Sequence, residues 1–434
     1  MDIRELYEKF IECEQLISTD TRMIEKGSLF FSWKGEVNDG NAFAREALDK
    51  GARYVVIDNP DFFINEQTIV VENSIRTLQE LAIYHRKHFD IPIIAIGGSN
   101  GKTTTKELIA DVLGTQKNVI ASLGSHNNHV GVPKTLLRIN RTTDVAVIEM
   151  GANHLGEIKQ LCEIAHPTIG LITNIGRDHI GLFGGPGAVI EANLELYNYL
   201  KAKQGHVFVN IQNKDLVHYA KGIDNTTLYG QGIPGEQGIR SLHTVPTISF
   251  EWKNYTVNTL LTGEYNMENI AAAIAVGKFF NITDDHIISS LQKFKPQSNR
   301  SEMYTSIKGN LIIKDFYNAN RTSMEHALEN LATMKEHDPK KNSVAILGDM
   351  FELGDFSSED HRAVVDTILE KGIETVILIG KEFRQVASEP QFLYFNTTDE
   401  AISGLSNYNF SNSIILLKAS NGMNFQKLFD SIEW

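Results

Sequence analysis

The sequence Ile93-Ile94-Ala95-Ile96-Gly97-Gly98-Ser99-Asn100-Gly101-Lys102-Thr103-Thr104-Thr105-Lys106-Glu107 joins an apolar strand, a glycine-rich loop and the start of a helix. Backbone N–H groups of such a loop and the N-terminus of its helix point at an anion. In this pattern Lys102 reaches the β- and γ-phosphates of a nucleotide, and the Thr103 hydroxyl ligates Mg²⁺. The general phosphate-loop motif has a glycine where Ile96 stands, so this loop is one residue shorter. An ordinary strand-to-helix turn is the alternative, but the stretch favours ATP or GTP use.

The length and composition predict a globular protein with more than one domain. A chain of 434 residues exceeds what one hydrophobic core usually supports. The formal net charge of −13 argues against nucleic-acid or anionic-membrane partners, which need clustered Lys and Arg. Cys13 and Cys162 are too few for a disulfide framework, so we expect packing residues in a reducing compartment. Because no apolar run approaches the ~18 residues of a membrane span, we expect a cytoplasmic protein without membrane insertion.

Three α/β units follow one another along the chain. Residues 1–91 alternate helical and extended patterns, and a proline then precedes the strand of the glycine loop. Residues 92–295 alternate strands, loops and helices, which predicts a central parallel sheet covered on both faces, with a β-rich excursion at 225–262. After a linker at 296–300, the rhythm of residues 296–434 predicts a doubly wound terminal domain.

Two polar side chains stand where predicted central strands end. Glu149 closes an apolar strand, and His179 follows the next strand and a glycine. Parallel sheets bind ligands at the carboxyl ends of their strands. A carboxylate and an imidazole beside Lys102 would suit Mg²⁺, although either residue alone is more often a cap or a satisfied polar group. Asn266 and Asn269 begin a later helix as caps or nucleotide contacts, and their spacing favours caps.

Several motifs together resemble the Mur ligase family, most closely its MurF type, which adds D-alanyl-D-alanine to a UDP-muramoyl tripeptide. The N-terminal motifs are DTR at 20–22 and GEVNDGNAFA at 35–44. The central motifs are GSNGKTTTKE at 98–107, NNHVGVP at 127–133, EMGANHLGEI at 149–158 and ITNIG at 172–176 with His179. The C-terminal motifs are DFYNAN at 315–320, LGDMFELG at 347–354 and KASNG at 418–422. The resemblance therefore covers nearly the whole chain.

The resemblance implies three domains: a UDP-sugar-binding α/β domain at 1–91, an ATP-binding P-loop domain at 92–295 and a Rossmann-like domain at 296–434. It implies an ATP-dependent acid–amino-acid ligase that works through an acyl phosphate in peptidoglycan precursor synthesis, with ATP and Mg²⁺, as a monomer. The implied catalytic residues are Lys102, Glu149 and His179, and the implied metal ligands are Thr103, Glu149 and His179. The implied nucleotide contacts are Gly98, Asn100, Gly101, Lys102, Thr103, Thr104, Asn266, Asn269, Arg300, Asp315 and Asn318. The implied contacts to the acid and amine substrates are Thr21, Arg22, Asn41, Asn127, Asn128, Asp349 and Lys418.

Four positions depart from the family pattern. The family commonly has a carbamylated lysine, acting as a carboxylate on a second Mg²⁺, where Asn193 stands. A neutral amide cannot supply that charge, and Glu191 is the nearest carboxylate in sequence. The stretch 181–187 lacks the usual glutamates, Arg177-Asp178 replaces a small residue, and Arg321 stands where proline is frequent. We expect these changes to cluster on the acyl-transfer side of the site.

The departures leave the acceptor open. The chain is either the housekeeping ligase or a diverged paralogue that joins another carboxylate and amine. A catalytically quiet nucleotide-binding homologue and an ATP-hydrolysing module without ligase chemistry are the alternatives from other functional classes.

Overall fold

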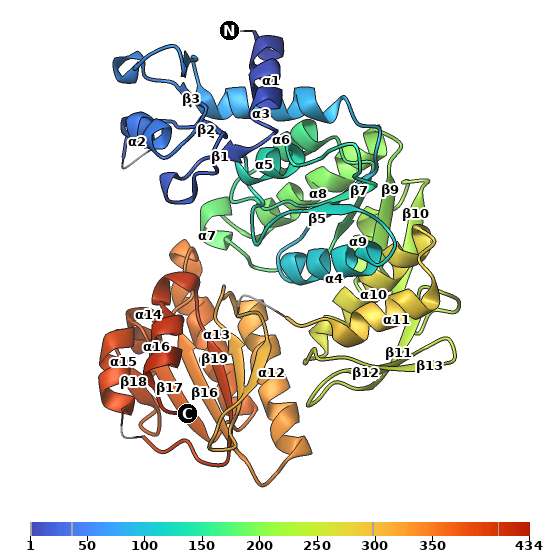
Figure 1. Cartoon of the computed structure of the whole chain (residues 1–434). Coiled ribbons are helices and arrows are strands. Elements are labelled where there is room, and N and C mark those ends of the chain that lie inside the picture. Colours follow the sequence, from blue (N-terminus) through green and yellow to red (C-terminus); the bar gives the residue numbers. More distant parts are fainter. Residues whose placement is uncertain (1, 36–37, 297–298, 407) are drawn as a thin grey trace.

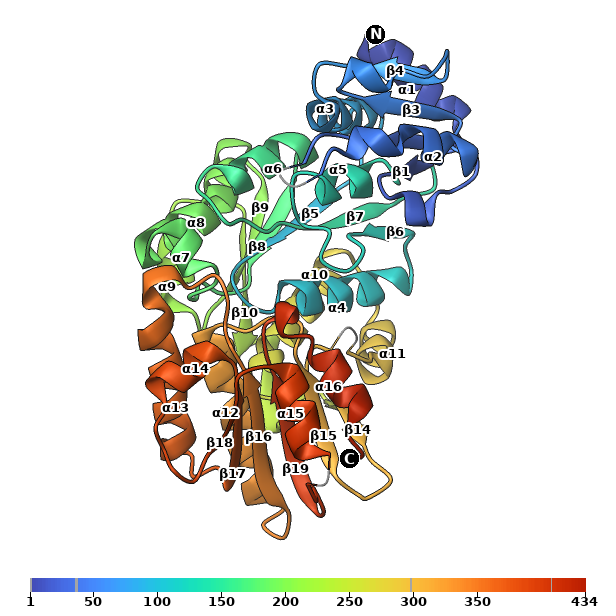
Figure 2. The same ribbon diagram turned by 90° about the vertical axis from the view of Figure 1, so that its left-hand side faces the viewer.

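The computed structural model describes residues 2–35, 38–296, 299–406 and 408–434, in three α/β parts whose order along the chain is also their order in space (Figures 1 and 2). Residues 36–37 of the N-terminal motif and 297–298 of the expected linker lie outside the described residues. In the part of the chain that is described, no helix is long and apolar enough to cross a membrane. Both cysteines are free and buried, which confirms the prediction that they are packing residues.

The N-terminal part contains a four-stranded parallel sheet in the order β1-β2-β3-β4. Its strands are β1 (Ile17–Ser18), β2 (Leu29–Phe31), β3 (Tyr54–Ile57) and β4 (Thr68–Val70). Its helices are α1 (Ile3–Glu12), α2 (Ala44–Asp49) and α3 (Ser74–Arg86). Helix α1 starts at a capping box in which the Asp2 carboxylate accepts from the Arg4 N–H and the Glu5 carboxylate accepts from the Asp2 N–H.

The central part is built on a nine-stranded sheet in the order β13-β12-β11-β10-β9-β8-β5-β7-β6. The strands are β5 (Ile93–Gly97), β6 (Val119–Ala121), β7 (Val145–Glu149), β8 (Ile169–Ile172), β9 (His206–Asn210), β10 (Thr226–Gln231), β11 (Gly238–His243), β12 (Ser249–Trp252) and β13 (Tyr255–Asn258). Strands β5 to β11 pair in parallel, whereas β12 and β13 are antiparallel. Residues 225–262 are β-rich, as the sequence predicted, and their strands extend the central sheet.

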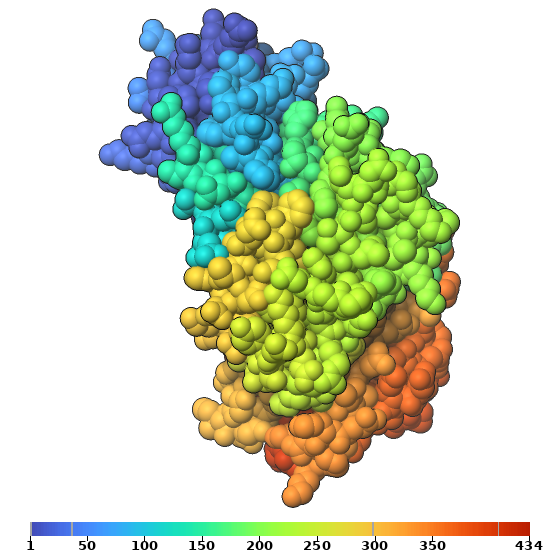
Figure 3. All heavy atoms as spheres, turned by 90° about the vertical axis from the view of Figure 1, so that its right-hand side faces the viewer, coloured from blue at the N-terminus to red at the C-terminus, as the bar shows by residue number. Residues whose placement is uncertain are grey.

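Helices cover the central sheet and connect its parallel strands. They are α4 (Lys102–Gly114), α5 (Gly131–Leu136), α6 (Glu157–Ala165), α7 (Ile180–Phe183), α8 (Pro186–Ala202), α9 (Lys214–Tyr219), α10 (Tyr265–Phe279) and α11 (Asp284–Lys293). Strands β5 and β7 are buried at every residue, which is why they read as continuous apolar runs. Figure 3 shows the β10–β13 region lying against the C-terminal part, where the Thr262 hydroxyl and the Asn330 amide form a hydrogen bond.

The C-terminal part has a six-stranded sheet in the order β14-β15-β19-β16-β17-β18. Its strands are β14 (Glu302–Thr305), β15 (Leu311–Asp315), β16 (Asn342–Gly348), β17 (Thr375–Ile379), β18 (Leu393–Phe395) and β19 (Ser413–Lys418). Its helices are α12 (Arg321–His337), α13 (Ser357–Glu370), α14 (Lys381–Val386), α15 (Thr398–Leu405) and α16 (Phe425–Ser431). The parallel order of β15 to β19 confirms the doubly wound fold, and β14 adds an antiparallel edge strand that the sequence did not indicate.

The register of the central sheet brings three polar segments to one edge. Strand β5 lies between β7 and β8, with Ile96 opposite Glu149 and Gly97 opposite Ile172. The glycine loop, Glu149 and the segment after β8 therefore leave the sheet at the same end. The C-terminal part faces this end (Figure 1).

Candidate active site

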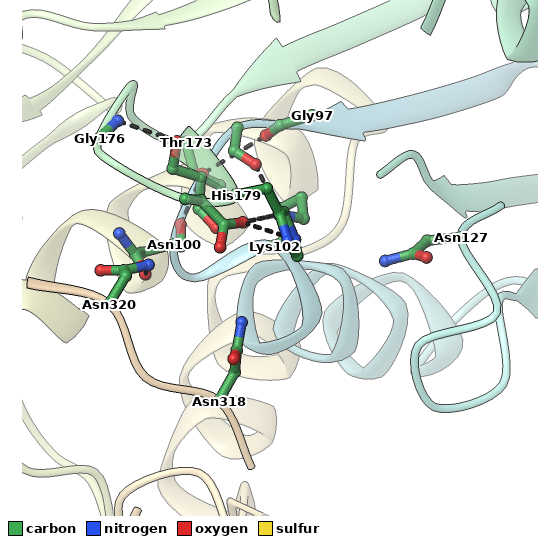
Figure 4. A network of polar contacts seen from close by, with 12 residues as sticks. Gly97, Asn100, Lys102, Asn127, Thr173, Gly176, His179, Asn318 and Asn320 are labelled. Atoms are coloured by element: carbon green, nitrogen blue, oxygen red, sulfur yellow. Dashed lines mark hydrogen bonds and ion pairs between the residues drawn. The ribbon is translucent and has the colours of Figure 1, made fainter. Parts of the chain in front are cut away.

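One cleft of about 1110 Å³ lies between the central and C-terminal parts. Residues of the glycine loop, Glu149 and His179 line its central side, and residues of α12 and of the ends of C-terminal strands line the other side. Figure 4 shows Asn127 and Asn318 reaching toward Lys102 from separate segments of the chain. The cleft therefore combines groups from both parts of the molecule.

The glycine loop has a backbone that only glycine accommodates at two positions. Gly98 has φ = 119°, and a Cβ atom there would lie 2.2 Å from the Thr173 hydroxyl oxygen. Gly101 has φ = 80°, and its Cβ would lie 2.8 Å from the Asn269 carbonyl oxygen. Both φ angles fall in the left-handed region that favours glycine. The same residues thus give the loop its shape and let its neighbours pack closely.

The segment after β8 holds this loop in place. The Asn174 side chain accepts from the Asn100 N–H at 3.0 Å and donates to the Asn100 carbonyl at 3.0 Å. The Thr173 hydroxyl donates to the same carbonyl at 2.7 Å, and the Ser99 hydroxyl accepts from the Gly176 N–H at 2.9 Å. The ITNIG motif therefore acts as a support for the loop.

The Lys102 ammonium folds back over its own loop. Its Nζ donates to the carbonyls of Gly98 at 2.6 Å and Ser99 at 2.9 Å, and lies 3.5 Å from Asp178 Oδ2. Both side chains of this ion pair are largely buried. An anion in the loop would compete for the same ammonium, because Lys has three donors and no acceptor.

The Glu149 carboxylate has one free oxygen in the cleft. Oε1 accepts from the Asn127 amide at 2.9 Å, whereas Oε2 is buried and accepts no hydrogen bond from the described residues. The Lys106 ammonium lies 4.0 Å from Oε2 and is itself bonded to the Gly124 carbonyl. A buried carboxylate oxygen that accepts no hydrogen bond is costly and suits a cation. Thr103 also lines the cleft, so hydroxyl and carboxylate donors for Mg²⁺ are present.

His179 occupies a left-handed backbone position just before α7, with φ = 51°. Its Nε2 lies 3.4 Å from Asp178 Oδ2, and its Nδ1 contacts the Glu352 carboxylate of the C-terminal part. Metal ligation by His179 would have to replace one of these contacts. The described residues contain no group of three or more His, Cys, Asp or Glu side chains assembled around a metal position. A cation here would complete its shell with water or phosphate oxygens.

The C-terminal side of the cleft presents a lysine–aspartate pair and a stacked arginine. Lys418 Nζ lies 2.6 Å from Asp315 Oδ2 and donates to the Asn318 carbonyl at 3.2 Å. The Arg300 guanidinium lies over the Tyr317 ring, 3.8 Å from its centroid. These groups can hold an anion and a flat ring, as nucleotide binding requires.

Asn266 and Asn269 line the cleft but do not cap a helix, so that interpretation was wrong. Helix α10 begins before both of them, at Tyr265. The Asn266 amide donates to the Thr262 carbonyl at 2.8 Å, and the Asn269 amide donates to the Asn266 side chain at 2.8 Å. The Thr105 hydroxyl donates to Asn269, which joins α10 to α4 beneath the glycine loop.

The structure places some expected substrate residues away from the cleft. Asn127 and Asn128 line it, whereas Thr21, Arg22 and Asn41 lie in the N-terminal part. Asn41 is fully buried and bonds the carboxylates of Asp39 and Asp58. These hydrogen bonds give Asn41 a structural role in the N-terminal part.

Asp349 also has a structural explanation. Its carboxylate accepts from the N–H groups of Glu382 and Phe383 at the start of α14. It lines a separate, smaller cavity of about 440 Å³, not the main cleft. Burial raises the pKa of Asp349.

Asn193 does not face the cleft. Its side chain is buried in α8 and donates to the Val189 carbonyl at 2.8 Å. Neither Asn193 nor Glu191 lines the cleft. Two of the other departures, Arg177 and Arg321, both lie beside Asp360 of α13, and their expected place on the acyl-transfer side stays a prediction.

Sequence reasoning missed Asp178 as a cleft residue, although its position beside His179 was a usable signal. It also missed Tyr265 and His326, whose rings stack 5.9 Å apart with an interplanar angle of 7°. Both line the cleft, and burial lowers the pKa of His326. The sequence around Tyr265 and around His326 does not indicate that their rings meet across the domain boundary.

Three family models match successive parts of the chain. They are described as Mur ligase family, catalytic domain, at residues 15–96, Mur ligase middle domain at 96–277, and Mur ligase, glutamate ligase domain, at 299–421. A Bacillus subtilis protein named UDP-N-acetylmuramoyl-tripeptide--D-alanyl-D-alanine ligase is 32% identical over 95% of this chain and 92% of its own length. A Synechocystis protein of the same name is 35% identical over 84% and 79%. The crystal structure of MurF from Acinetobacter baumannii has a TM-score of 0.83 and 27% identity over 96% of this chain and 93% of its own.

Proposed function

This chain belongs to the Mur ligase family, and we propose that it uses ATP to join D-alanyl-D-alanine to a UDP-N-acetylmuramoyl tripeptide in peptidoglycan precursor synthesis. One observation carries the proposal: a single cleft contains the phosphate-loop lysine, the free oxygen of Glu149 and the Lys418–Asp315 pair. Two relatives that share 32% and 35% identity with the chain carry this activity in their names.

We propose that the substrate carboxylate attacks the γ-phosphorus of ATP and displaces ADP to form an acyl phosphate. The amine of D-alanyl-D-alanine then attacks the acyl carbon, and inorganic phosphate and a proton leave as the amide forms. Lys102 would leave its loop carbonyls and neutralise the transferring phosphoryl group, since such transfers depend on positioning and charge compensation. Thr103 and Glu149 would hold Mg²⁺, which when bound offsets the negative charge of the phosphates. Arg300 and Asn318 would position the nucleotide from the C-terminal side.

The two-sided cleft explains why a water-sensitive acyl phosphate would survive. Central and C-terminal groups meet at the glycine loop, where the Asn320 amide donates to the Asn100 side chain at 2.8 Å (Figure 4). Bringing both sides together excludes water from the activated carbonyl. The proposal includes a monomer in the cytoplasm and domain bounds of 1–91, 92–295 and 296–434.

The test is incubation of the whole chain with MgATP, a UDP-muramoyl tripeptide and D-alanyl-D-alanine, with phosphate release and product mass measured together. We expect equal amounts of phosphate and of a product heavier by the dipeptide minus water. Phosphate without the product would indicate an ATP-hydrolysing module. If neither phosphate nor the ligated product forms, the proposal is overturned in favour of a nucleotide-binding homologue. Activity only with another acid or amine would indicate a diverged paralogue.

A further inference from the structure

The loop that carries His179 is attached to the C-terminal domain more closely than its sequence position suggests. We call residues 177–185, which precede α8, the histidine loop. The Gly181 N–H donates to the Glu352 carbonyl at 3.1 Å, and a Cβ atom at Gly181 would lie 2.4 Å from the Gly354 nitrogen. Ile180 is fully buried and belongs to the apolar cluster of the C-terminal sheet. The central domain thus inserts this loop into its neighbour.

A buried ion pair anchors the start of this loop. Arg177 Nε donates to Asp360 Oδ2 at 3.1 Å, and Arg177 Nη2 lies 2.8 Å from Oδ1 in an ion pair that does not have hydrogen-bond geometry. Asp360 is fully buried in α13, and the Arg177 side chain is 25% exposed. The guanidinium also lies 5.5 Å from the centroid of the Phe356 ring. The ion pair, its one charge-assisted hydrogen bond and the contact with the Phe356 ring together hold the guanidinium against α13.

Two of the four departures from the family pattern meet at this carboxylate. Arg321, at the start of α12, lies 3.8 Å from Asp360 Oδ1 and 3.6 Å from the exposed Glu359. Arg177 comes from the central domain and Arg321 from the C-terminal domain, so Asp360 is paired from both sides of the boundary. Pairing with Asp360 is therefore a structural role that Arg177 and Arg321 share.

The residues that follow Arg177 face the reaction centre. Asp178 lies 3.5 Å from the Lys102 ammonium, and His179 lies between Asp178 and Glu352. One end of this short segment therefore contacts the phosphate-loop lysine and the other contacts the C-terminal domain. A shift of either domain would move both groups relative to the nucleotide.

We propose that Arg177 is a positioning residue whose ion pair with Asp360 makes the placement of Asp178 and His179 beside Lys102 depend on docking of the C-terminal domain. The inference rests on the proposed function for its catalytic consequence. Removing one partner of a buried ion pair leaves the other group buried without its partner, so each variant should also lose some stability. Nucleotide binding should change less than chemistry, because neither Arg177 nor Asp360 lines the cleft.

The test is a double-mutant cycle with Arg177→Met and Asp360→Asn in the full chain. Dyes on Glu163→Cys and Glu370→Cys, on the exposed faces of α6 and α13, report the distance between the domains. Burial raises the pKa of both native thiols, which directs labelling to the introduced cysteines. We expect each variant to widen the distance distribution and to lower kcat about 10- to 100-fold, with ATP affinity within about twofold.

The double variant should resemble either single variant, because both remove the same contact. Arg362→Met is the matched control, since this arginine of α13 pairs with Asp366 and Glu389 inside the C-terminal domain. Unchanged distances and kcat in Arg177→Met, or effects that add in the double variant, would overturn the inference. Absence of ligase activity in the unmodified chain would instead count against the proposed function. The measurement of the interdomain distance would still test whether Arg177 depends on docking of the C-terminal domain. Thermal unfolding of each variant separates misfolding from loss of docking.

Discussion

The glycine loop and the histidine loop face each other across Lys102 but obtain their shapes from different sources. The glycine loop is held by Thr173 and Asn174 of the same domain, and the C-terminal domain reaches it through Asn320. The histidine loop is held by contacts with the C-terminal domain. These are the Arg177–Asp360 ion pair, the hydrogen bond from the Gly181 N–H to the Glu352 carbonyl, and the burial of Ile180 in the apolar cluster of that domain. One half of the site is therefore preformed within a domain, and the other half depends on how two domains meet.

Lys102→Met is the largest expected perturbation and should act without moving the domains. The substitution removes the ammonium that would neutralise the phosphoryl group, so kcat/KM should fall about 1000-fold. The distance between the domains should stay unchanged, because the polar partners of Lys102 among the described residues are central-domain groups. Steady-state phosphate release and the interdomain distance measure the two effects.

Lys159→Met is the control for this substitution, since that side chain is 69% exposed on α6. It should leave both readouts unchanged. A fall of less than about tenfold in Lys102→Met would mean that another cation does this work.

Gly181→Ala tests the opposite half of the comparison. A Cβ atom 2.4 Å from the Gly354 nitrogen forces the loop and the C-terminal domain apart. We expect kcat to fall about tenfold and the free energy of unfolding to fall by about 1–3 kcal/mol, because overpacking displaces the backbone. Kinetics, urea unfolding and the interdomain distance together report the change.

Gly187→Ala is the matched control, because a Cβ atom there meets nothing within 4 Å. In the first turn of α8 this change should be neutral or stabilise the chain by up to about 1 kcal/mol. Equal losses in the two variants would show that helix or loop propensity, not the domain contact, sets the effect.

The sequence predicted the preformed half well for a physical reason. Strand, glycines and helix start are contiguous, so the backbone conformation of the loop follows from local residues such as Gly98 and Gly101. The fold of three α/β units followed in the same way from the alternation of apolar and helical patterns. Membership in the Mur ligase family, inferred from the motifs, is confirmed by relatives that cover most of the chain.

The domain-dependent half could not be predicted because its partners are far apart in sequence. Arg177 and Asp360 are separated by 183 positions, and nothing local marks them as a pair. Asn193 was assigned to the position of the carbamylated lysine from its spacing to His179, but its side-chain amide donates to the Val189 carbonyl within α8. The β14 edge strand and the strands β10–β13 likewise depend on tertiary pairing, which residue patterns alone do not specify.

His361 offers the smallest expected effect, confined to the C-terminal side. The side chain is fully buried in α13, where Nε2 accepts from the Met350 N–H at 3.0 Å and Nδ1 lies 2.8 Å from the Ser357 carbonyl. These two bonds define the neutral form, with the proton on Nδ1. Met350 starts the segment that continues to Glu352 at the histidine loop. Burial lowers the pKa of His361, although the carboxylates that face it, those of Asp349, Glu382 and Asp360, oppose this shift.

The lowered pKa of His361 makes the free energy of unfolding depend on pH. An unfolded histidine binds a proton near pH 6.5, whereas folded His361 resists it, so the unfolded chain binds more protons just below that pH. The free energy of unfolding should therefore decrease as pH falls from about 6.5 toward the lower folded pKa, by at most about 1.4 kcal/mol per pH unit. In His361→Gln this contribution should disappear, while exposed His218→Gln should keep it. Urea unfolding between about pH 5 and 7 measures the difference, and equal slopes in all three proteins would mean that His361 is not held neutral at the junction.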